Sequence, residues 1–406
     1  MEATTGKSKS KNPIIFIFIT VLIDCIGIGI IVPVIASLVT EVSHVNLNLA
    51  TTYSGYMMAT YAVMQFIFAP VLGGLSDKYG RRPVLLLSLF GLGCDYIFLS
   101  FANTLPLLFV GRVIAGICGA SFTTSFAYIA DVSAPEKRAQ NFGMMGAAFG
   151  LGFIIGPMLG GLFSGLGVRA PFIAAACFSL INWLYGYFIL PESLKPENRR
   201  NFDIKRANPF GAFAQLRKSK HIRTLVVGVF LLYLAGQVMP SIWPFYTKFM
   251  FHWTDREIGY SLAFVGIMIS IVQGGLIKFS QKKFGTNKAI FIGLTLYFIG
   301  LGLLSMATQS WMIYAFVFVY SLGAIAPPAL QAVISGRVSA TEQGELQGMM
   351  TGLNSISTIL SPLIMTNLFY FFSKDTAPFY FPGASFAAAA ILIFFGGVLC
   401  VKGLKE

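Results

Sequence analysis

Residues 52–102 read TYSGYMMATYAVMQFIFAPVLGGLSDKYGRRPVLLLSLFGLGCDYIFLSFA, and this stretch decides the fold. Two apolar runs, at about 52–74 and 83–102, flank a short loop that carries four charged residues. Each run has the length of roughly 20 residues with which an α-helix crosses the hydrocarbon core of a bilayer. A spanning segment must satisfy its own backbone hydrogen bonds, so it is a helix or part of a closed barrel. The strict alternation of apolar and polar residues that barrel strands need is absent. The stretch therefore predicts two membrane-spanning helices joined by a tight charged turn.

The same pattern recurs from end to end of the chain. Hydrophobic residues make up 56% of the 406 residues and charged residues only 11%, against roughly 25% charged in a soluble domain. We therefore expect an all-α membrane protein. The apolar run that follows the polar segment 1–12 is too long for the core of a signal peptide, so we expect it to be retained as the first span. The twelve predicted spans lie at about 13–38, 52–74, 83–102, 105–128, 140–163, 170–190, 222–247, 257–279, 288–308, 311–334, 346–371 and 377–401.

The basic residues predict the orientation. Of the 29 lysines and arginines, 24 fall in loops or termini on one side of the predicted spans. Lysine and arginine accumulate on the cytoplasmic side of membrane proteins, so both termini of this multi-pass protein should be cytoplasmic. The net charge of +13 is thereby explained by topology, and no nucleic-acid partner is expected.

The longest polar stretch divides the spans into two sets of six. We expect an N-terminal six-helix half at 1–190, a cytoplasmic linker at 191–221 and a C-terminal six-helix half at 222–406. This six-plus-six plan is typical of transporters that bind their substrate between two repeats. The loop sequence GGLSDKYGRRP after the second span has a weaker counterpart, GGLIKFSQKKFGTNK, after the eighth.

Three ionisable residues interrupt the apolar runs at membrane depth: Asp24, Asp95 and Arg112. An ionised aspartate at the centre of a membrane helix costs about 2.5–3.5 kcal/mol on insertion scales. Burial favours the neutral carboxyl group, whereas a nearby cation favours the carboxylate. Such an acid can exchange a proton for a substrate, although a neutral acid that only joins two helices by a hydrogen bond would also satisfy the pattern. The arginine is either part of the same machinery or a static helix partner.

The charged turn contains Gly73, Asp77, Gly80, Arg81 and Arg82. Its glycines permit a tight turn and close approach of two helix ends, and its aspartate can pair with arginine. Such contacts could form a conformational latch; the alternative is a basic inner turn with no further role.

The turn resembles the GxLaDrxGrk signature of the major facilitator superfamily. Two further segments match signatures of that family: Leu108-x-x-x-Arg112-x-x-x-Gly116 in the fourth span, and the antiporter-associated glycine pattern in the fifth. The members of that pattern, called here the glycine stripe, are Gly152, Gly156, Pro157, Gly160 and Gly161.

Over nearly its whole length the chain more closely resembles the TetA-type tetracycline resistance exporters among the twelve-span drug/proton antiporters. Segments that carry this resemblance include GCDYIFLSFA, YIADVSAPEKRAQNFG, GQVMPSIWPF and GELQGMMTGLNSISTILSPLI. The resemblance implies alternating access, functional roles for Asp24 and Asp95, and a role for Arg112 in proton relay or gating. It also adds a part in rocking or leak prevention to the packing role of the glycine stripe. Asp131, at the end of the fourth span, is expected to pair with the charged turn or to be a solvated helix end.

Candidate substrate contacts are Gln65 in the second span, and Gln237 and Trp243 in the seventh. Two departures from the resemblance bear on the substrate. TetA-type exporters have a histidine in the eighth span and an aspartate in the ninth, where this chain has Ile269 and Tyr297. Tetracycline is therefore a possible substrate rather than an assured one.

Other chemistries find little support. The five cysteines form no CxxC pattern, the three histidines form no metal motif, and no nucleophile–base pair or phosphate loop occurs. We thus expect no enzyme activity, no cofactor and no metal site, and a monomer whose partners are a small-molecule substrate, protons and the bilayer. The leading hypothesis is proton-coupled export of an amphipathic compound. The alternatives are a facilitator or symporter that imports a sugar, organic acid or siderophore, and a signalling protein on a transporter fold.

Overall fold

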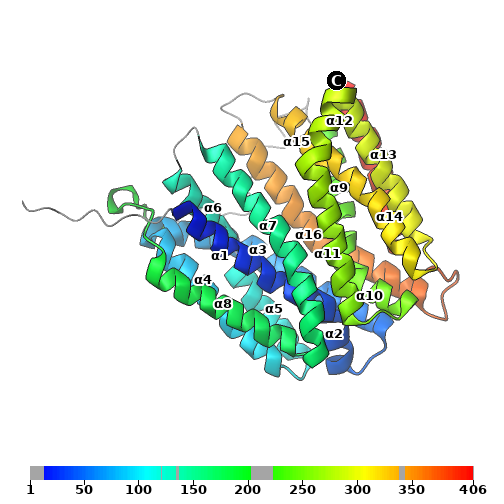
Figure 1. Cartoon of the computed structure of the whole chain (residues 1–406), viewed down its shortest axis with the longest axis horizontal. Coiled ribbons are helices and arrows are strands. Elements are labelled where there is room, and N and C mark those ends of the chain that lie inside the picture. Colours follow the sequence, from blue (N-terminus) through cyan, green and yellow to red (C-terminus); the bar gives the residue numbers. More distant parts are fainter. Residues whose placement is uncertain (1–12, 120, 134–136, 203–222, 338–342, 406) are drawn as a thin grey trace, which may run out of the picture.

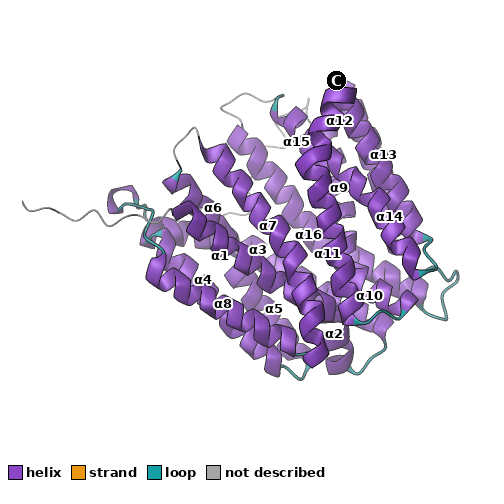
Figure 2. Ribbon diagram, viewed as in Figure 1, coloured by secondary structure: helices purple, strands orange, loops and turns teal. Residues whose placement is uncertain are grey.

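The computed structural model describes residues 13–119, 121–133, 137–202, 223–337 and 343–405. These residues contain twelve helices long and apolar enough to cross a membrane, which confirms the predicted number of spans. Figure 2 shows helices joined by short loops, with no strand in the described segments. The elements are α1 (Pro13–Ile31), η1 (Val32–Val34), α2 (Ile35–Ser43), α3 (Leu47–Tyr79), α4 (Arg81–Phe101), α5 (Leu105–Gly119), α6 (Ser121–Val132), α7 (Arg138–Phe163), η3 (Ser164–Leu166), α8 (Ala170–Ile189), η4 (Pro196–Asn198), α9 (Arg223–Gly236), α10 (Val238–Phe251), α11 (Asp255–Ile271), η7 (Val272–Leu276), α12 (Ile277–Phe284), α13 (Thr286–Ser305), α14 (Ser310–Leu322), η8 (Gly323–Ile325), α15 (Ala326–Ser335), α16 (Gln343–Ser373) and α17 (Ala384–Lys405).

Several spans consist of two helical segments, and prolines lie at three of the breaks. Pro240 lies in the first turn of α10 and has no N–H to offer the carbonyl of Gly236, four residues earlier, so the span breaks between α9 and α10 at Gln237. Pro33 lies in the 3₁₀ turn η1 between α1 and α2. Pro327 and Pro328 begin α15 directly after η8. Broken membrane helices bring backbone and polar side chains to the interior of transporters.

The helices form two groups that converge at one end of the bundle (Figure 1). The end that carries the turn between α3 and α4 is called here the basic end, and the other the opposite end. Near the opposite end α7 packs against α11, and α3 against α16. The largest hydrophobic cluster combines residues from both groups, for example Leu38 of α2 with Tyr246 of α10. Two smaller clusters are confined to one group each, around Tyr128 and around Leu330. The protein is therefore closed at the opposite end and open at the basic end.

The glycine stripe of α7 lies where the helices approach most closely. A Cβ on Gly160 would lie 2.0 Å from the carbonyl oxygen of Ile30 in α1, and one on Gly156 would lie 2.7 Å from the Cα of Gly29. Gly161 faces the backbone of Arg256 in α11. By contrast, a Cβ on Gly146, nearer the basic end of α7, would meet no atom within 4 Å. The glycines of α7 are thus packed tightly near the opposite end, whereas Gly146 near the basic end has no close neighbour.

Candidate functional site

The three ionisable residues predicted at membrane depth lie together in the N-terminal half. Asp24 of α1 is 6% exposed and Asp95 of α4 is 1% exposed. An Nη of Arg112, from α5, is 3.9 Å from Oδ2 of Asp95, which is an ion-pair contact but too long for a hydrogen bond. Oδ1 of Asp24 and both carboxylate oxygens of Asp95 have no hydrogen-bond partner among the described residues. Buried polar groups are normally hydrogen-bonded. These carboxylate oxygens are therefore unusual, and each could bind a proton or accept a hydrogen bond from water.

Two tyrosines connect these acids. Tyr96, which follows Asp95 in α4, interacts electrostatically with Asp24, Asp95 and Arg112. Its ring packs 3.6 Å from the position of a Cβ on Gly27, one turn along α1 from Asp24. Tyr61 of α3 interacts electrostatically with Asp24 and Arg112. We call the set Asp24, Tyr61, Asp95, Tyr96 and Arg112 the acid cluster.

Gln65 lies between the acid cluster and a cavity. Its Nε2 lies 3.3 Å from the hydroxyl oxygen of Tyr61 and 3.2 Å from the carbonyl oxygen of Gly119. The same glutamine lines a cavity of about 470 Å³ between α3, α6 and α16, called here the interface cavity. Residues of α16 such as Thr351 and Ser355 form its other wall. The predicted substrate contact Gln65 thus has one side in a cavity and the other on a hydroxyl of the acid cluster.

A second cavity, of about 320 Å³, lies within the C-terminal half and is called here the C-half cavity. All described side chains that line it are uncharged. The rings of Tyr297 of α13 and Tyr320 of α14 contact each other in its wall at an angle of 54°, with centroids 5.0 Å apart. Asn354 of α16 lines both cavities, so the two adjoin. The amide side chains that line the C-half cavity are Gln237, Gln273, Gln331, Gln347 and Asn354.

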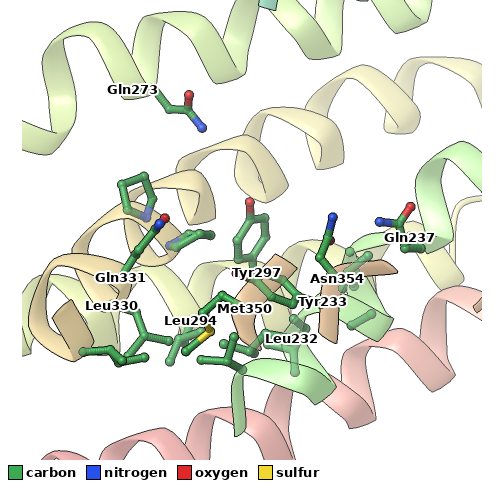
Figure 3. A pocket seen from close by; sticks show the side chains of 18 of the residues that line it. Leu232, Tyr233, Gln237, Gln273, Leu294, Tyr297, Leu330, Gln331, Met350 and Asn354 are labelled. Atoms are coloured by element: carbon green, nitrogen blue, oxygen red, sulfur yellow. The ribbon is translucent and has the colours of Figure 1, made fainter. Parts of the chain in front are cut away.

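Figure 3 shows how the polar groups are arranged. The hydroxyl of Tyr297 and the amides of Asn354 and Gln237 point to the same side, and Gln273 approaches from the facing helix. Leu232, Leu294, Leu330 and Met350 lie below them. The cavity therefore has a polar side and an apolar side.

The structure places the other predicted substrate contact elsewhere. Trp243 lies outside the residues that line the two cavities, is fully buried and donates its indole N–H to Ser261 at 2.9 Å. Its ring also contacts Phe386 edge to face. An indole needs a hydrogen-bond acceptor when buried, and Ser261 satisfies that need within the core. Trp243 is therefore a packing residue in this conformation.

Sequence reasoning missed most of the C-half cavity. Gln273 lies in η7, a π-helical turn that interrupts the span between α11 and α12. Such turns occur frequently at functional sites, and the adjacent Gly274 and Gly275 were a signal for one. Ile269, by contrast, packs in a small hydrophobic cluster with Leu276. Nothing in the local sequence marked Asn354 and Gln347 as cavity residues. In a long amphipathic helix, the sequence alone does not show whether an uncharged amide faces a cavity or another surface.

The charged turn at the basic end is held by arginine and glutamate contacts within the N-terminal half. Nη1 of Arg81 is 2.5 Å from Oδ1 of Asp77, and its Nε is 3.1 Å from Oδ2 of Asp131 at the end of α6. Gly80 has φ +104°, a conformation that favours glycine. Asp131 therefore lies beside the turn.

Glu192, after α8, caps the start of α4. Its carboxylate accepts hydrogen bonds from the backbone N–H groups of Arg81 at 2.8 Å and Arg82 at 3.2 Å. The side chain of Arg82 donates to the carbonyl of Tyr187 at 2.7 Å. Gly73 has a looser environment, since its Cβ would lie 3.7 Å from Thr123. Sequence reasoning found the turn but missed Glu192, which is distant in the chain.

Among the described residues no three His, Cys, Asp or Glu side chains are grouped to hold a metal ion. The family model for the Major Facilitator Superfamily matches residues 17–283 and 275–401. The chain belongs to the major facilitator superfamily.

Comparison with individual proteins places the chain within this superfamily. It is 40% identical over 361 residues to the class C tetracycline resistance protein of Escherichia coli, which covers 89% of this chain and 90% of that protein. It is 36% identical over 387 residues to the class H protein of Pasteurella multocida, with 94% of each chain covered. A solved structure of a bacterial homolog of the human lysosomal transporter Spinster superposes with a TM-score of 0.76 at 13% identity, over 97% of this chain and 96% of that one. The chain is thus a multi-pass transporter of the superfamily, related to the tetracycline resistance proteins.

Within the superfamily fold, the two functional regions are separate. The acid cluster occupies the N-terminal half, and the C-half cavity, with its uncharged lining, occupies the other. The interface cavity and Gln65 lie between them. A change of protonation and a change of substrate occupancy can therefore act on different parts of the same molecule.

Proposed function

We propose that this protein exports an amphipathic, drug-like small molecule across a bacterial cytoplasmic membrane in exchange for protons, by alternating access. Tetracycline is a candidate substrate because the chain resembles proteins named for resistance to it over most of its length. The substrate leaves chemically unchanged, and the transporter acts as a monomer with both termini in the cytoplasm.

The observation that carries the proposal is the pair of carboxyl groups at membrane depth with unpartnered oxygens. Asp24 and Asp95 are buried in helices that cross the membrane, yet three of their four carboxylate oxygens have no hydrogen-bond partner among the described residues. Ionisable residues within membrane helices mark proton relays and substrate pathways. Arg112 is near enough to stabilise one ionised acid, but not so tightly bonded that it prevents protonation.

The orientation follows from the charges. The turn with Arg81 and Arg82 lies at the basic end, where the backbone N–H of Arg200 donates to the carbonyl of Asp77, and the positive-inside rule assigns this end to the cytoplasm. The protein is open at this end, so the conformation is inward-facing. In it a ligand can reach the two cavities from the cytoplasm, as export requires.

Gln65 and Tyr61 provide the route for coupling. A ligand in the interface cavity that bonds Gln65 competes for the amide that now donates to the hydroxyl of Tyr61. Tyr61 in turn lies close to Asp24 and Arg112. Ligand binding can thereby change the relative stability of the protonated and ionised acids, which is the differential affinity that exchange needs.

The test uses purified protein in proteoliposomes with an acidic interior and tetracycline outside as the probe. We expect tetracycline to accumulate in the vesicles and a trapped pH dye to report proton release. Asp24→Asn and Asp95→Asn should each lower proton-coupled uptake by at least about tenfold, because an amide cannot carry the proton. Asp375→Asn, in an exposed turn, is the matched control and should transport normally.

The direction of transport and its coupling to protons can each contradict the proposal. Proton-independent movement of every tested ligand would reject exchange. Accumulation of a sugar, organic acid or siderophore in cells that express the protein would support import instead.

A further inference from the structure

We infer that the C-half cavity selects an uncharged amphipathic ligand with hydroxyl, carbonyl or amide groups, and that it does so without a metal ion. The inference rests on the proposed export function and specifies the chemistry of its substrate. Its basis is the side chains that line the cavity and the way that they are arranged.

Charge is the first argument. All described side chains that line the C-half cavity and the adjoining interface cavity are uncharged. A charged ligand group taken from water into such a lining would lose its hydration without gaining a counter-ion, and this is costly. The buried acids Asp24 and Asp95 line neither cavity. A ligand that is neutral where it meets this lining avoids the cost.

The hydrogen-bonding inventory is the second argument. Each glutamine and asparagine offers both donors and an acceptor, and a tyrosine hydroxyl does both. Gln237, Gln273, Asn354 and Tyr297 therefore match groups that also donate and accept, such as hydroxyls and amides. Mg²⁺ in proteins is usually held through carboxylates, and the lining has none.

The separation of polar and apolar surfaces is the third argument. Leu232, Leu294, Leu330 and Met350 lie on one side of the polar groups in Figure 3. A flat aromatic or alicyclic body can rest on these side chains and the Tyr297–Tyr320 pair, with its polar edge toward the amides. The volume of about 320 Å³ is at the lower end of the range for drug-sized ligands.

Gln273 gives the site a feature of its own. The π-helical turn η7 brings it to the cavity from the helix that faces Tyr297 (Figure 3). The neighbouring Gly274 and Gly275 have no atom within 4 Å of a Cβ position, so this segment has room to adjust to a ligand. Gln273 can therefore contact the edge of a ligand that lies on the opposite wall.

The test measures equilibrium binding to the full chain in nanodiscs at constant pH. Chloramphenicol, an uncharged aromatic amide with two hydroxyls, is compared with ethidium, a permanent aromatic cation. We expect saturable chloramphenicol binding in EDTA that Mg²⁺ leaves unchanged, and ethidium binding at least about tenfold weaker. The double variant Q273L/Y297F should weaken chloramphenicol binding about tenfold, since it removes two hydrogen bonds to the ligand.

Two further variants make the result specific. Gln309→Leu, an exposed glutamine outside the cavity, should bind chloramphenicol as the wild type does. Gln331→Glu adds a negative charge to the lining and should reverse the order of the two probes. Tighter binding of ethidium than of chloramphenicol to the wild type, binding only with Mg²⁺, or no saturable chloramphenicol binding to folded protein would each overturn the inference.

The experiment separates this inference from the proposed export function. Asp24→Asn should lose proton-coupled transport but keep saturable chloramphenicol binding that Mg²⁺ leaves unchanged. Binding as expected without any coupled flux would reject exchange and leave the ligand class standing. Coupled flux of tetracycline that requires Mg²⁺ would support exchange and reject the metal-free ligand class.

Discussion

Asp24 and Asp95 differ from surface carboxylates because three of their four carboxylate oxygens are buried and accept no hydrogen bond from a described residue. Asp95 has only a 3.9 Å contact with Arg112, and Asp24 lacks even that. Such a carboxyl group is easily converted between its two forms by a small change in its surroundings. A permanently bonded pair would be more stable but could not exchange a proton.

Tyr61→Phe tests the connection between cavity and acids. The variant keeps the ring that packs against Gly119 and removes only the hydroxyl that Gln65 bonds. We expect ligand affinity to change little and proton-coupled flux to fall roughly two- to tenfold, the effect of one hydrogen bond. The measurement is flux in proteoliposomes beside equilibrium binding.

Tyr56→Phe is the control for that variant, because Tyr56 is an exposed tyrosine of the same helix. Equal flux in the Tyr61 and Tyr56 variants would show that the hydroxyl has no part in coupling.

At the residue scale the charged members of the candidate site could be picked out from the sequence, and their roles stay predictions. Asp24, Asp95 and Arg112 are conspicuous because a charge in an apolar run is costly. Amides such as Gln273 and Asn354 are not conspicuous, since their cost is smaller and the cavity that they line is formed by several spans. Trp243 was predicted as a substrate contact. In the structure its indole N–H donates to Ser261, and the side chain lies in the core.

Among the elements, α7 is the clearest case of one helix with two environments. Near the opposite end its glycines contact α1 on one side and α11 on the other. Near the basic end, Gly143, Gly146 and Gly150 face no close neighbour. Small residues allow membrane helices to pack at short distance, and here the tight half joins the two groups of spans.

Replacement of a tight glycine by alanine should differ from replacement of an open one. Gly160→Ala places a methyl group against the backbone of Ile30, which cannot move away without shifting α1. We expect a loss of about 1–3 kcal/mol and a lower Tm in detergent. Gly146→Ala meets open space and should leave Tm unchanged or raise it, because alanine favours the helix by about 1 kcal/mol. Equal Tm values for the two variants would contradict the packing described for α7.

The number of spans could be predicted because each must be long and apolar to cross a bilayer. Their ends were predicted less well: α3 was expected to end near residue 74 but continues to Tyr79, since helices extend beyond the hydrocarbon into water. Part of the predicted linker, residues 203–221, lies outside the described residues. The division into two halves stays a prediction, supported by the way in which the spans pack.

On the scale of the whole molecule, a polar network bridges the two groups at the opposite end. Ser37 of α2 donates to the carboxylate of Asp255 at 2.6 Å, and Nζ of Lys248 lies 3.0 Å from the same carboxylate. Asn48 adds a hydrogen bond at 3.0 Å to the carbonyl of Ser373. The turn at the basic end, by contrast, is bonded within one half through Arg81. The network therefore stabilises the conformation that is closed at the opposite end.

Asp255→Asn should shift the molecule toward its outward-facing state. The amide keeps the shape of the side chain and loses the charge that binds Lys248. Hydrogen bonds to charged groups contribute about 1.5–3 kcal/mol, so we expect a roughly ten- to hundredfold change in the ratio of states. Hydrogen–deuterium exchange should rise in α2 and α10 and fall at the basic end.

Asp375→Asn, at an exposed position, is the control for that measurement. An unchanged exchange pattern in Asp255→Asn would show that the network does not select between the two states.

The division of the hydrophobic clusters has a consequence for where each transport cycle starts. Contacts that join the groups are concentrated at the opposite end, while toward the basic end each group has a cluster of its own. In the proposed orientation, the conformation without ligand is therefore the one that is open to the cytoplasm. A cytosolic compound would then bind at its first encounter, without a preceding conformational change.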